Sequence, residues 1–249
     1  MRYHGFFTRD YLILDNIPIG KETSVLEIGV GTGSTAELIV ARVKEFCGVD
    51  ISKEIIEVLN SFYVNNVCVN MYCLDVCSDV SLGKRFNVIY STDTLEHVKQ
   101  PKVFFNFIVR HLFFDGVAVV TFPNESEEKH HGITWFNSKA DLLMLIDRVG
   151  LRVINFYEVR GTTWHRIIRK YLWELPKSLV SRQNMTTLPQ TFEQTEAFQI
   201  IRDGGIKTRF FGYYARTITK LAALFPLYDY FEVGQKINNK VLLMCLKHK

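Results

Sequence analysis

Short apolar runs alternate with segments of helical period along most of this chain. The apolar runs predict seven strands, at 24–28, 45–50, 67–74, 86–91, 117–122, 151–159 and 239–247. The segments between them predict helices at 34–43, 52–64, 101–114 and 138–149. Strands that alternate with helices in this way predict an α/β fold with a mostly parallel sheet.

The predicted helices carry residues typical of helix ends. Ser34, Ser52 and Ser138 stand where a side chain can cap exposed backbone N–H groups. Pro101 suits a first helical turn, because the nitrogen there has no hydrogen bond to lose. Gly150 is expected to end the helix that starts at Ser138.

Two outer segments lie apart from this alternation. Residues 1–17 predict an amphipathic helix that packs on the domain or covers its site. Residues 161–238 are too long for a plain connection, so they predict an insert with its own structure, aromatic and helical over 209–231. We therefore expect a main domain, 1–160 plus 239–249, and a helical insert that caps it.

Composition and charge narrow the function classes. The 249 residues are 47% hydrophobic and 22% charged, which is ordinary for a globular protein. The net charge of +4 is modest and no basic run is present, which disfavours a nucleic-acid partner. The first residues lack the apolar region of a signal peptide, and no uncharged run is long enough to span a membrane.

The cysteines indicate a reducing compartment. There are five, an odd number that does not suggest a disulfide framework, so we expect a cytoplasmic protein. Cys68, Cys73 and Cys77 lie close together, but their gaps lack the spacing of structural zinc sites. No metal site is expected.

The stretch VLEIGVGTGSTAEL, residues 25–38, matches two cofactor patterns at once. From Gly31 it satisfies the dinucleotide fingerprint G-x-G-x-x-G/A. From Glu27 it matches the nucleoside-binding turn of S-adenosylmethionine (SAM) enzymes. Glu27 favours SAM, because a carboxylate suits a ligand with an ammonium and a sulfonium better than it suits a pyrophosphate.

Two aspartates follow at the ends of the next strands. Asp50, in FCGVDIS, is placed to bind ribose hydroxyls, which both cofactors require. Asp75, in MYCLDV, can accept a hydrogen bond from the adenine amine, which a dinucleotide domain does not require there. The alternative for Asp75 is an aspartate that only forms a turn.

The motifs VLEIGVGTG, GVDIS, LDV and FNVIYSTDTLEHVKQP occur in an order and at a spacing that resemble class I SAM-dependent methyltransferases. The LEHV segment is similar to the ubiquinone-biosynthesis-like branch of that family. The resemblance covers about residues 22 to 160 and the last strand. It implies a Rossmann-like seven-stranded sheet with helices on both faces and the last strand antiparallel.

By position, the resemblance also implies a SAM site. Its residues, from the methionyl part through ribose and adenine to the sulfonium, are Glu27, Gly29, Gly31, Asp50, Ile51, Asp75, Val76, Ser91 and Thr92. Asn87 departs from the family, which often has aspartate there. This position lies at a strand start, so the departure does not affect the cofactor.

Methyl transfer to a hydroxyl is helped by a general base, and histidine is suited to that role near neutral pH. His131, and next to it His130, follow the fifth predicted strand, where substrate contacts are expected. The alternative is that they only shape a loop. His97, in LEHV, is expected to pack beneath the cofactor, and His165 to be exposed on the insert.

The insert is expected to select the acceptor. Its aromatic and cationic residues suit a small-molecule, glycan or lipid-like acceptor, and 209–231 either packs on the domain or contacts a membrane surface. Two other functions stay open: a NAD-dependent oxidoreductase and a non-catalytic SAM-binding protein.

Overall fold

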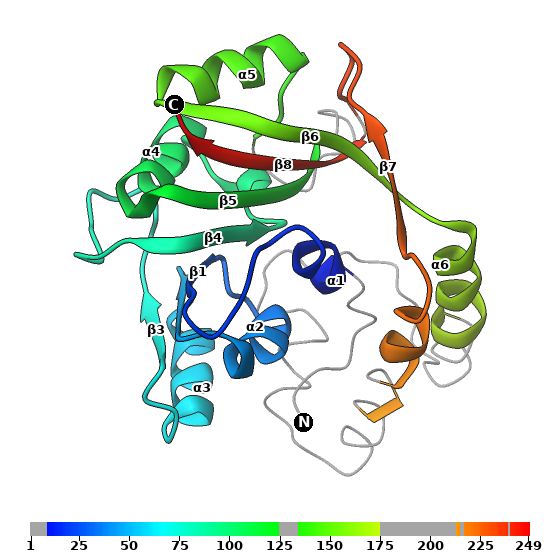
Figure 1. Ribbon diagram of the computed structural model, residues 1–249, viewed down its shortest axis with the longest axis horizontal. Helices are drawn as coiled ribbons and strands as arrows, with labels where there is room; N and C mark the ends of the chain where they lie inside the picture. Colours follow the sequence, from blue (N-terminus) through cyan, green and yellow to red (C-terminus); the bar gives the residue numbers. More distant parts are fainter. Residues whose placement is uncertain (1–8, 125–133, 175–212, 215–216, 239) are drawn as a thin grey trace. The chain divides into compact units, whose positions relative to one another are not determined.

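The protein forms two compact units, shown in the computed structural model of Figure 1. The structure describes residues 9–124, 134–174, 213–214, 217–238 and 240–249. The sheet unit is Ile13–Arg160 with Tyr230–Lys249, and the insert unit is Met1–Leu12 with Gly161–Asp229.

Eight strands form one sheet in the order β3-β2-β1-β4-β5-β8-β6-β7 (Figure 1). Their bounds are β1 Ser24–Ile28, β2 Glu45–Asp50, β3 Val69–Cys73, β4 Phe86–Thr92, β5 Leu112–Asn124, β6 Leu151–Gly161, β7 Tyr228–Glu232 and β8 Lys240–His248. Strands β1 to β5 pair in parallel, whereas β8 is antiparallel to both β5 and β6. The predicted α/β class and the antiparallel last strand are confirmed.

The predicted count of seven strands is wrong, because β7 lies in the stretch expected to be helical. Tyr228–Glu232 reads YDYFE, and aromatic residues at this density favour a strand as much as a helix. Pro226 stands just before it, and proline disfavours helical continuation from the preceding residues.

The helices of the sheet unit follow the prediction closely, with shorter ends. They are α2 Ser34–Ile39, continued by a 3₁₀ turn to Arg42, α3 Lys53–Tyr63, α4 Pro101–His111 and α5 Lys139–Arg148. The Ser52 and Ser138 side chains accept hydrogen bonds from the third residue beyond them, as caps do. The helix α2 opens on Ser34 as expected, and the N-cap position before it is taken by Gly33, which has a φ of 72° and no side-chain cap.

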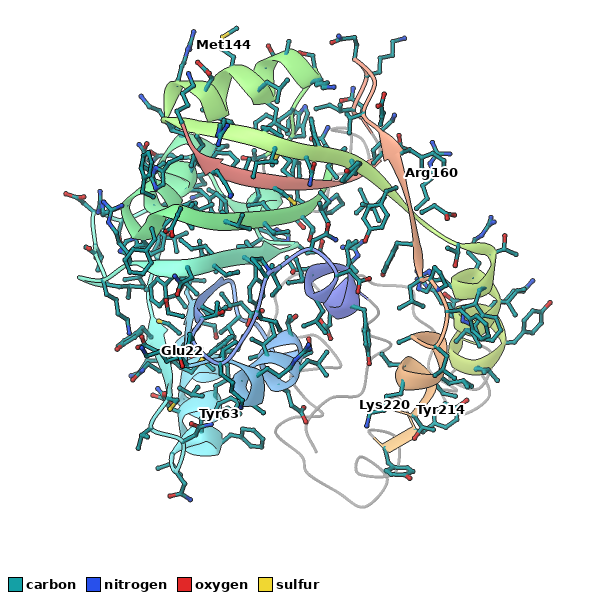
Figure 2. All side chains as sticks on the ribbon, in the orientation of Figure 1. Glu22, Tyr63, Met144, Arg160, Tyr214 and Lys220 are labelled. Carbon is teal, nitrogen blue, oxygen red and sulfur yellow. The ribbon has the colours of Figure 1, made fainter. Side chains whose placement is uncertain are left out.

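Both faces of the sheet are buried, as the resemblance implied. Alternate residues of β1, β4 and β5, such as Leu26, Ile89 and Val120, share one hydrophobic cluster with buried side chains of α4 and α5. The residues between them are buried on the other face, and α2 and α3 contact β2 and β3. On α5, Leu142 and Ile146 are buried, whereas Met144 points outward (Figure 2) and is half exposed.

At the amino edge of the sheet, Asn87 joins β4 to β1. Its Oδ1 accepts from Ser24 N and from Ser24 Oγ, each at 2.9 Å. The departure from the family pattern at Asn87 therefore has a local role, at the edge away from the glycine loop.

The insert unit has its own small core. Its helix α6, Thr163–Ile168, continues as a π-helix to Glu174 and packs by Ile168 against Ile218, Ala222 and Leu227. The two ends of the insert are bonded to each other, since Thr162 N donates to Leu227 O at 3.0 Å.

His165 of the insert unit is buried, so its expected exposure is wrong. Its ring lies 5.3 Å from the Tyr228 ring, centroid to centroid. Burial lowers the pKa of His165, and the charges of Arg169 and Arg9 lower it further. Whether the insert caps the site stays a prediction.

The first predicted helix is seen in part. Residues 1–8 lie outside the described chain, and α1 spans Arg9–Leu14, ending before the predicted residue 17. Among the described residues, no helix is both long and apolar enough to cross a bilayer.

His111, the last residue of α4, is buried and holds the loop that precedes β4. Its Nε2 accepts from Leu82 N at 3.0 Å, and its Nδ1 lies 2.8 Å from Phe107 O, to which it donates. An acceptor nitrogen requires the neutral ring. Burial lowers the pKa of His111, against a partial rise from the Phe107 hydrogen bond, and nearby arginines lower it further.

We expect acid to destabilise the protein partly through His111. In the unfolded chain its pKa is about 6.5, so below that pH the unfolded state binds the proton first and the free energy of unfolding falls. Urea denaturation at about pH 7.5 and about pH 5.5 should show this fall, and His111→Asn should make it smaller. His248→Asn, which leaves His111 intact, is the control; an equal fall in wild type and His111→Asn would contradict the assignment.

Candidate nucleotide-binding site at the carboxyl edge of the sheet

The glycine loop after β1 gives its glycines different roles. Gly29, Gly31 and Gly33 have φ values of 75°, 48° and 72°, in the region that favours glycine. A Cβ on Gly29 would lie 2.1 Å from Thr94 Oγ1, so Gly29 is required for packing. A Cβ on Gly31 would have no atom closer than 3.9 Å, so Gly31 faces open space that a ligand can use.

Asp50, at the end of β2, ties this loop to the next helix. Its Oδ2 accepts from Gly31 N and its Oδ1 accepts from Ser52 N, each at 2.9 Å. A carboxylate oxygen has more than one acceptor position, so both oxygens keep capacity for a ligand. Ile51, the next residue, exposes 71% of its surface beside this carboxylate, an apolar face of the kind that a nucleoside base covers.

Glu27 is buried in β1, one residue before the strand ends at Ile28 and the glycine loop begins. It pairs in register with Gly48 of β2 and Tyr90 of β4, and only 3% of its surface is exposed. Buried carboxylates are rare and costly unless paired. Its position places a carboxyl group beside the start of the glycine loop.

Asp75 forms a turn at the end of β3. Its Oδ1 accepts from Cys77 N at 2.8 Å. This hydrogen bond is the one expected of an aspartate that forms a turn, the alternative considered for this residue. Asp75 is also exposed, so a ligand can reach its carboxylate. The Val76 side chain is buried in the core, so only its backbone can contribute to the site, and its place at the adenine stays a prediction.

The end of β4 is tied to the end of β1. Ser91 is fully buried and its Oγ donates to Ile28 O at 2.9 Å. Thr94 Oγ1 donates to Thr92 O at 3.1 Å and also lies 3.3 Å from Ile28 O. Ser91 and Thr94 therefore position the glycine loop.

The LEHV segment forms a 3₁₀ turn, Leu95–His97, after β4. Leu95 and Glu96 are buried, whereas the His97 side chain is 58% exposed, with Nε2 3.9 Å from Glu96 Oε1. His97 is therefore not packed in the core, whereas Leu95 is, and a place for His97 beneath the cofactor stays a prediction.

Sequence reasoning missed Asp93 and Thr121. Asp93 follows β4 with a φ of 50°, the one positive value outside glycine among the described residues, and its N–H donates to Thr121 O at 3.0 Å. Strained backbone of this kind collects at functional sites. The signal was present in the sequence, since aspartate tolerates this conformation and stands two residues after the predicted strand 86–91.

His130 and His131 lie in residues 125–133, outside the described chain. Both ends of this segment are anchored at the site. Asn124 is fully buried, and its Nδ2 donates to Phe136 O at 2.9 Å while its Oδ1 accepts from Phe136 N at 2.7 Å. Thr134 N donates to Glu96 O at 2.9 Å, which fixes the return of the chain beside the LEHV turn.

An ion-paired cluster lies at the same edge, on β6 and β8. Glu158 accepts from Arg160 Nε at 2.6 Å and from Lys240 Nζ at 2.5 Å, and Lys240 pairs in register with Asn124. Burial alone would raise the pKa of Glu158, but the hydrogen bonds from Lys240 and Arg160 lower it. These two cations are therefore engaged within the protein.

The chain matches a family model described as a methyltransferase domain over residues 9–171, which is more than half of its length. A comparison with curated proteins finds no match.

Solved structures share the fold. The [4+2]-cyclase SpnF is 14% identical with a TM-score of 0.58, over 97% of this chain and 80% of its own. Phosphoethanolamine N-methyltransferase 2 of Haemonchus contortus, with SAM bound, is 17% identical with a TM-score of 0.58, over 98% of this chain and 53% of its own. A TehB-like SAM-dependent methyltransferase of Corynebacterium glutamicum is 20% identical with a TM-score of 0.50, over 61% of this chain and 77% of its own. At these identities the likenesses show the fold alone.

The two glycines should respond differently to alanine. Gly29→Ala combines a left-handed alanine, about 1–2 kcal/mol, with overpacking of about 1–3 kcal/mol, so we expect a loss of roughly 2–5 kcal/mol. Gly31→Ala should cost only the first part, about 1–2 kcal/mol. Urea denaturation measures both; equal losses would contradict the division of roles, and Thr94→Ala should partly restore the Gly29→Ala protein.

Proposed function

We propose, because this chain belongs to the family of SAM-dependent methyltransferases, that it methylates an oxygen or nitrogen of a small-molecule, glycan or lipid-like acceptor. The LEHV segment supports a place in the ubiquinone-biosynthesis-like branch. Phosphoethanolamine N-methyltransferase, one of the proteins with this fold, is named for a small-molecule acceptor, which is compatible with the proposal.

The observation that carries the choice of SAM over NAD is the hydrogen bond from Gly31 N to Asp50 Oδ2. A dinucleotide loop offers its free N–H groups to a pyrophosphate. Here that N–H already donates to a carboxylate, whose charge also repels a phosphate. The same arrangement suits a ligand that carries a cation and a ribose.

The residues present fit SAM. Asp50 would accept from the ribose hydroxyls, and the exposed Ile51 would cover a face of the adenine. Gly31 leaves the space that the methionyl part needs, and Glu27 offers a carboxyl group suited to its cationic groups. Asp75 keeps one carboxylate oxygen available for the adenine amine.

When bound, SAM supplies an electrophilic methyl group. The acceptor's lone pair forms a bond to the methyl carbon while the carbon–sulfur bond breaks and its electrons pass to sulfur. The acceptor also loses a proton. The protein's part is mainly to hold the acceptor in line, which can contribute up to about 7–11 kcal/mol. For a hydroxyl acceptor, we assign the proton to His131, with His130 as the second choice. The anchors at Asn124 and Thr134 support this, because they bring the segment's two ends to the site.

The insert unit is proposed to cap the acceptor and to contact a membrane surface through 209–231. Leu224 and Phe225 are 70% and 57% exposed, and Lys220 lies one turn before them. These two residues lie in the turn before β7 rather than in a helix, so the support for a membrane contact is their exposure beside a cation.

Titration calorimetry with SAM and with NAD tests the cofactor, and labelled SAM with extracts of small molecules tests transfer. Saturable NAD binding without SAM binding would contradict the proposal. Tight SAM binding with no transfer to any extract would favour a non-catalytic role.

Asp50→Ala should weaken SAM binding by about 1.5–3 kcal/mol, because a charged acceptor is lost. Calorimetry measures this as a fall in affinity. Glu45→Ala is the matched control: Glu45 stands at the opposite end of the same strand, paired with Lys84. Unchanged SAM affinity in Asp50→Ala, or an equal loss in Glu45→Ala, would place the cofactor elsewhere.

His131→Ala should lower turnover by about 10²–10⁴-fold, the usual worth of a general base, and leave SAM affinity unchanged. A transfer assay with the identified acceptor measures this, with His97→Ala as the comparison. Normal turnover in the His131 variant would remove it as the base.

A further inference from the structure

Two threonine hydroxyls lie side by side at the carboxyl edge without a hydrogen-bond partner. Thr92 ends β4, and Thr121 is its register partner on β5. Neighbouring strands are about 4.8 Å apart, so the two side chains are close. Both Oγ1 atoms are buried, and neither has a partner among the described residues.

The two hydroxyls face the same side of the sheet. Side chains alternate along a strand, and Ile89 of β4 and Val120 of β5 belong to the cluster with α4 and α5. Thr92 and Thr121 therefore lie on the opposite face. Glu27 of β1 lies there too, because its neighbours in the strand belong to that same cluster.

Two neighbouring hydroxyls, those of Ser91 and Thr94, are satisfied within the protein. Ser91 donates to Ile28 O, and Thr94 donates to Thr92 O. Folded proteins leave few buried polar groups unsatisfied, and each such group needs an explanation. Two on adjacent strands, beside the glycine loop and the strained Asp93, indicate a polar ligand atom between them.

The surrounding charges restrict what that atom can be. Threonine hydroxyls are neutral and can both donate and accept. A buried anion beside them would stay uncompensated, because neutral hydroxyls supply no positive charge. Lys240 and Arg160 do not supply it either, because both are paired with Glu158. A hydroxyl or an amine fits these conditions, and a carboxylate or phosphate does not.

We propose that the Thr92 and Thr121 hydroxyls form the polar subsite that holds the acceptor's reacting atom, and that this atom belongs to a hydroxyl or an amine. The inference rests on the proposed methyltransferase function and adds to it the residues that orient the acceptor. Thr92 then serves the acceptor rather than the cofactor. The pair are positioning residues that bind and aim the nucleophile without exchanging its proton.

Phenol and toluene are suitable probes, since they share a shape and differ in one hydroxyl. Ligand-observed NMR titration of the wild-type protein, with and without S-adenosylhomocysteine, should show phenol binding about tenfold tighter than toluene, the ratio expected for one buried hydrogen bond. Thr92→Val and Thr121→Val should bring that ratio close to one by weakening phenol alone. SAM affinity, measured by calorimetry, should stay within about twofold of wild type in both variants, because valine has nearly the same shape as the threonine that it replaces.

Thr23→Val is the matched control. Thr23 precedes β1 at the amino edge, where its Oγ1 accepts from Gly20 N at 3.0 Å, so the phenol preference should persist. The thermal stability of Thr92→Val and Thr121→Val should be equal to wild type or higher, because each removes an unsatisfied hydroxyl.

No phenol preference in wild type, or a preference kept in both valine variants, overturns the subsite. A clear loss of stability in both variants overturns it as well, since the hydroxyls would then be structural. Failure of the wild-type protein to bind SAM would instead overturn the proposed function, and calorimetry reads that separately.

Discussion

The carboxylate of Asp50 is the interaction on which the carboxyl edge of the sheet depends. It accepts from Gly31 N and from Ser52 N, so one side chain holds the glycine loop against β2 and starts α3. Gly29 fits beneath Thr94, which in turn bonds the end of β4. The three parallel strands β2, β1 and β4 therefore end in one connected arrangement, and its open side is at Gly31.

Much of this arrangement could be predicted from the sequence because it is local. The β-strands before Gly29 and Asp50 are short apolar runs, and motifs at strand ends place their residues at one edge of a parallel sheet. What could not be predicted was pairing across strands. The contact of Gly29 with Thr94, the level positions of Thr92 and Thr121, and the burial of His165 depend on register and packing, which hydrophobic period does not encode.

The strand β7 shows the limit of the periodicity argument. YDYFE satisfies a helical aromatic pattern about as well as a strand pattern, and only the partner strand β6 decides between them. The same ambiguity does not affect β1 or β4, where uninterrupted apolar residues are buried on both faces and match a central parallel strand.

The fold by itself leaves the reaction open, since a [4+2]-cyclase and two methyltransferases share it with this chain. The connection of the insert has an evolutionary consequence. It leaves the sheet from β6 and returns through the neighbouring strand β7, and Thr162 bonds Leu227 across its base. Because its two ends are held together, the entropy of closing the loop depends only weakly on its length. Lineages could therefore exchange or lengthen this insert without shifting the register of any strand of the sheet.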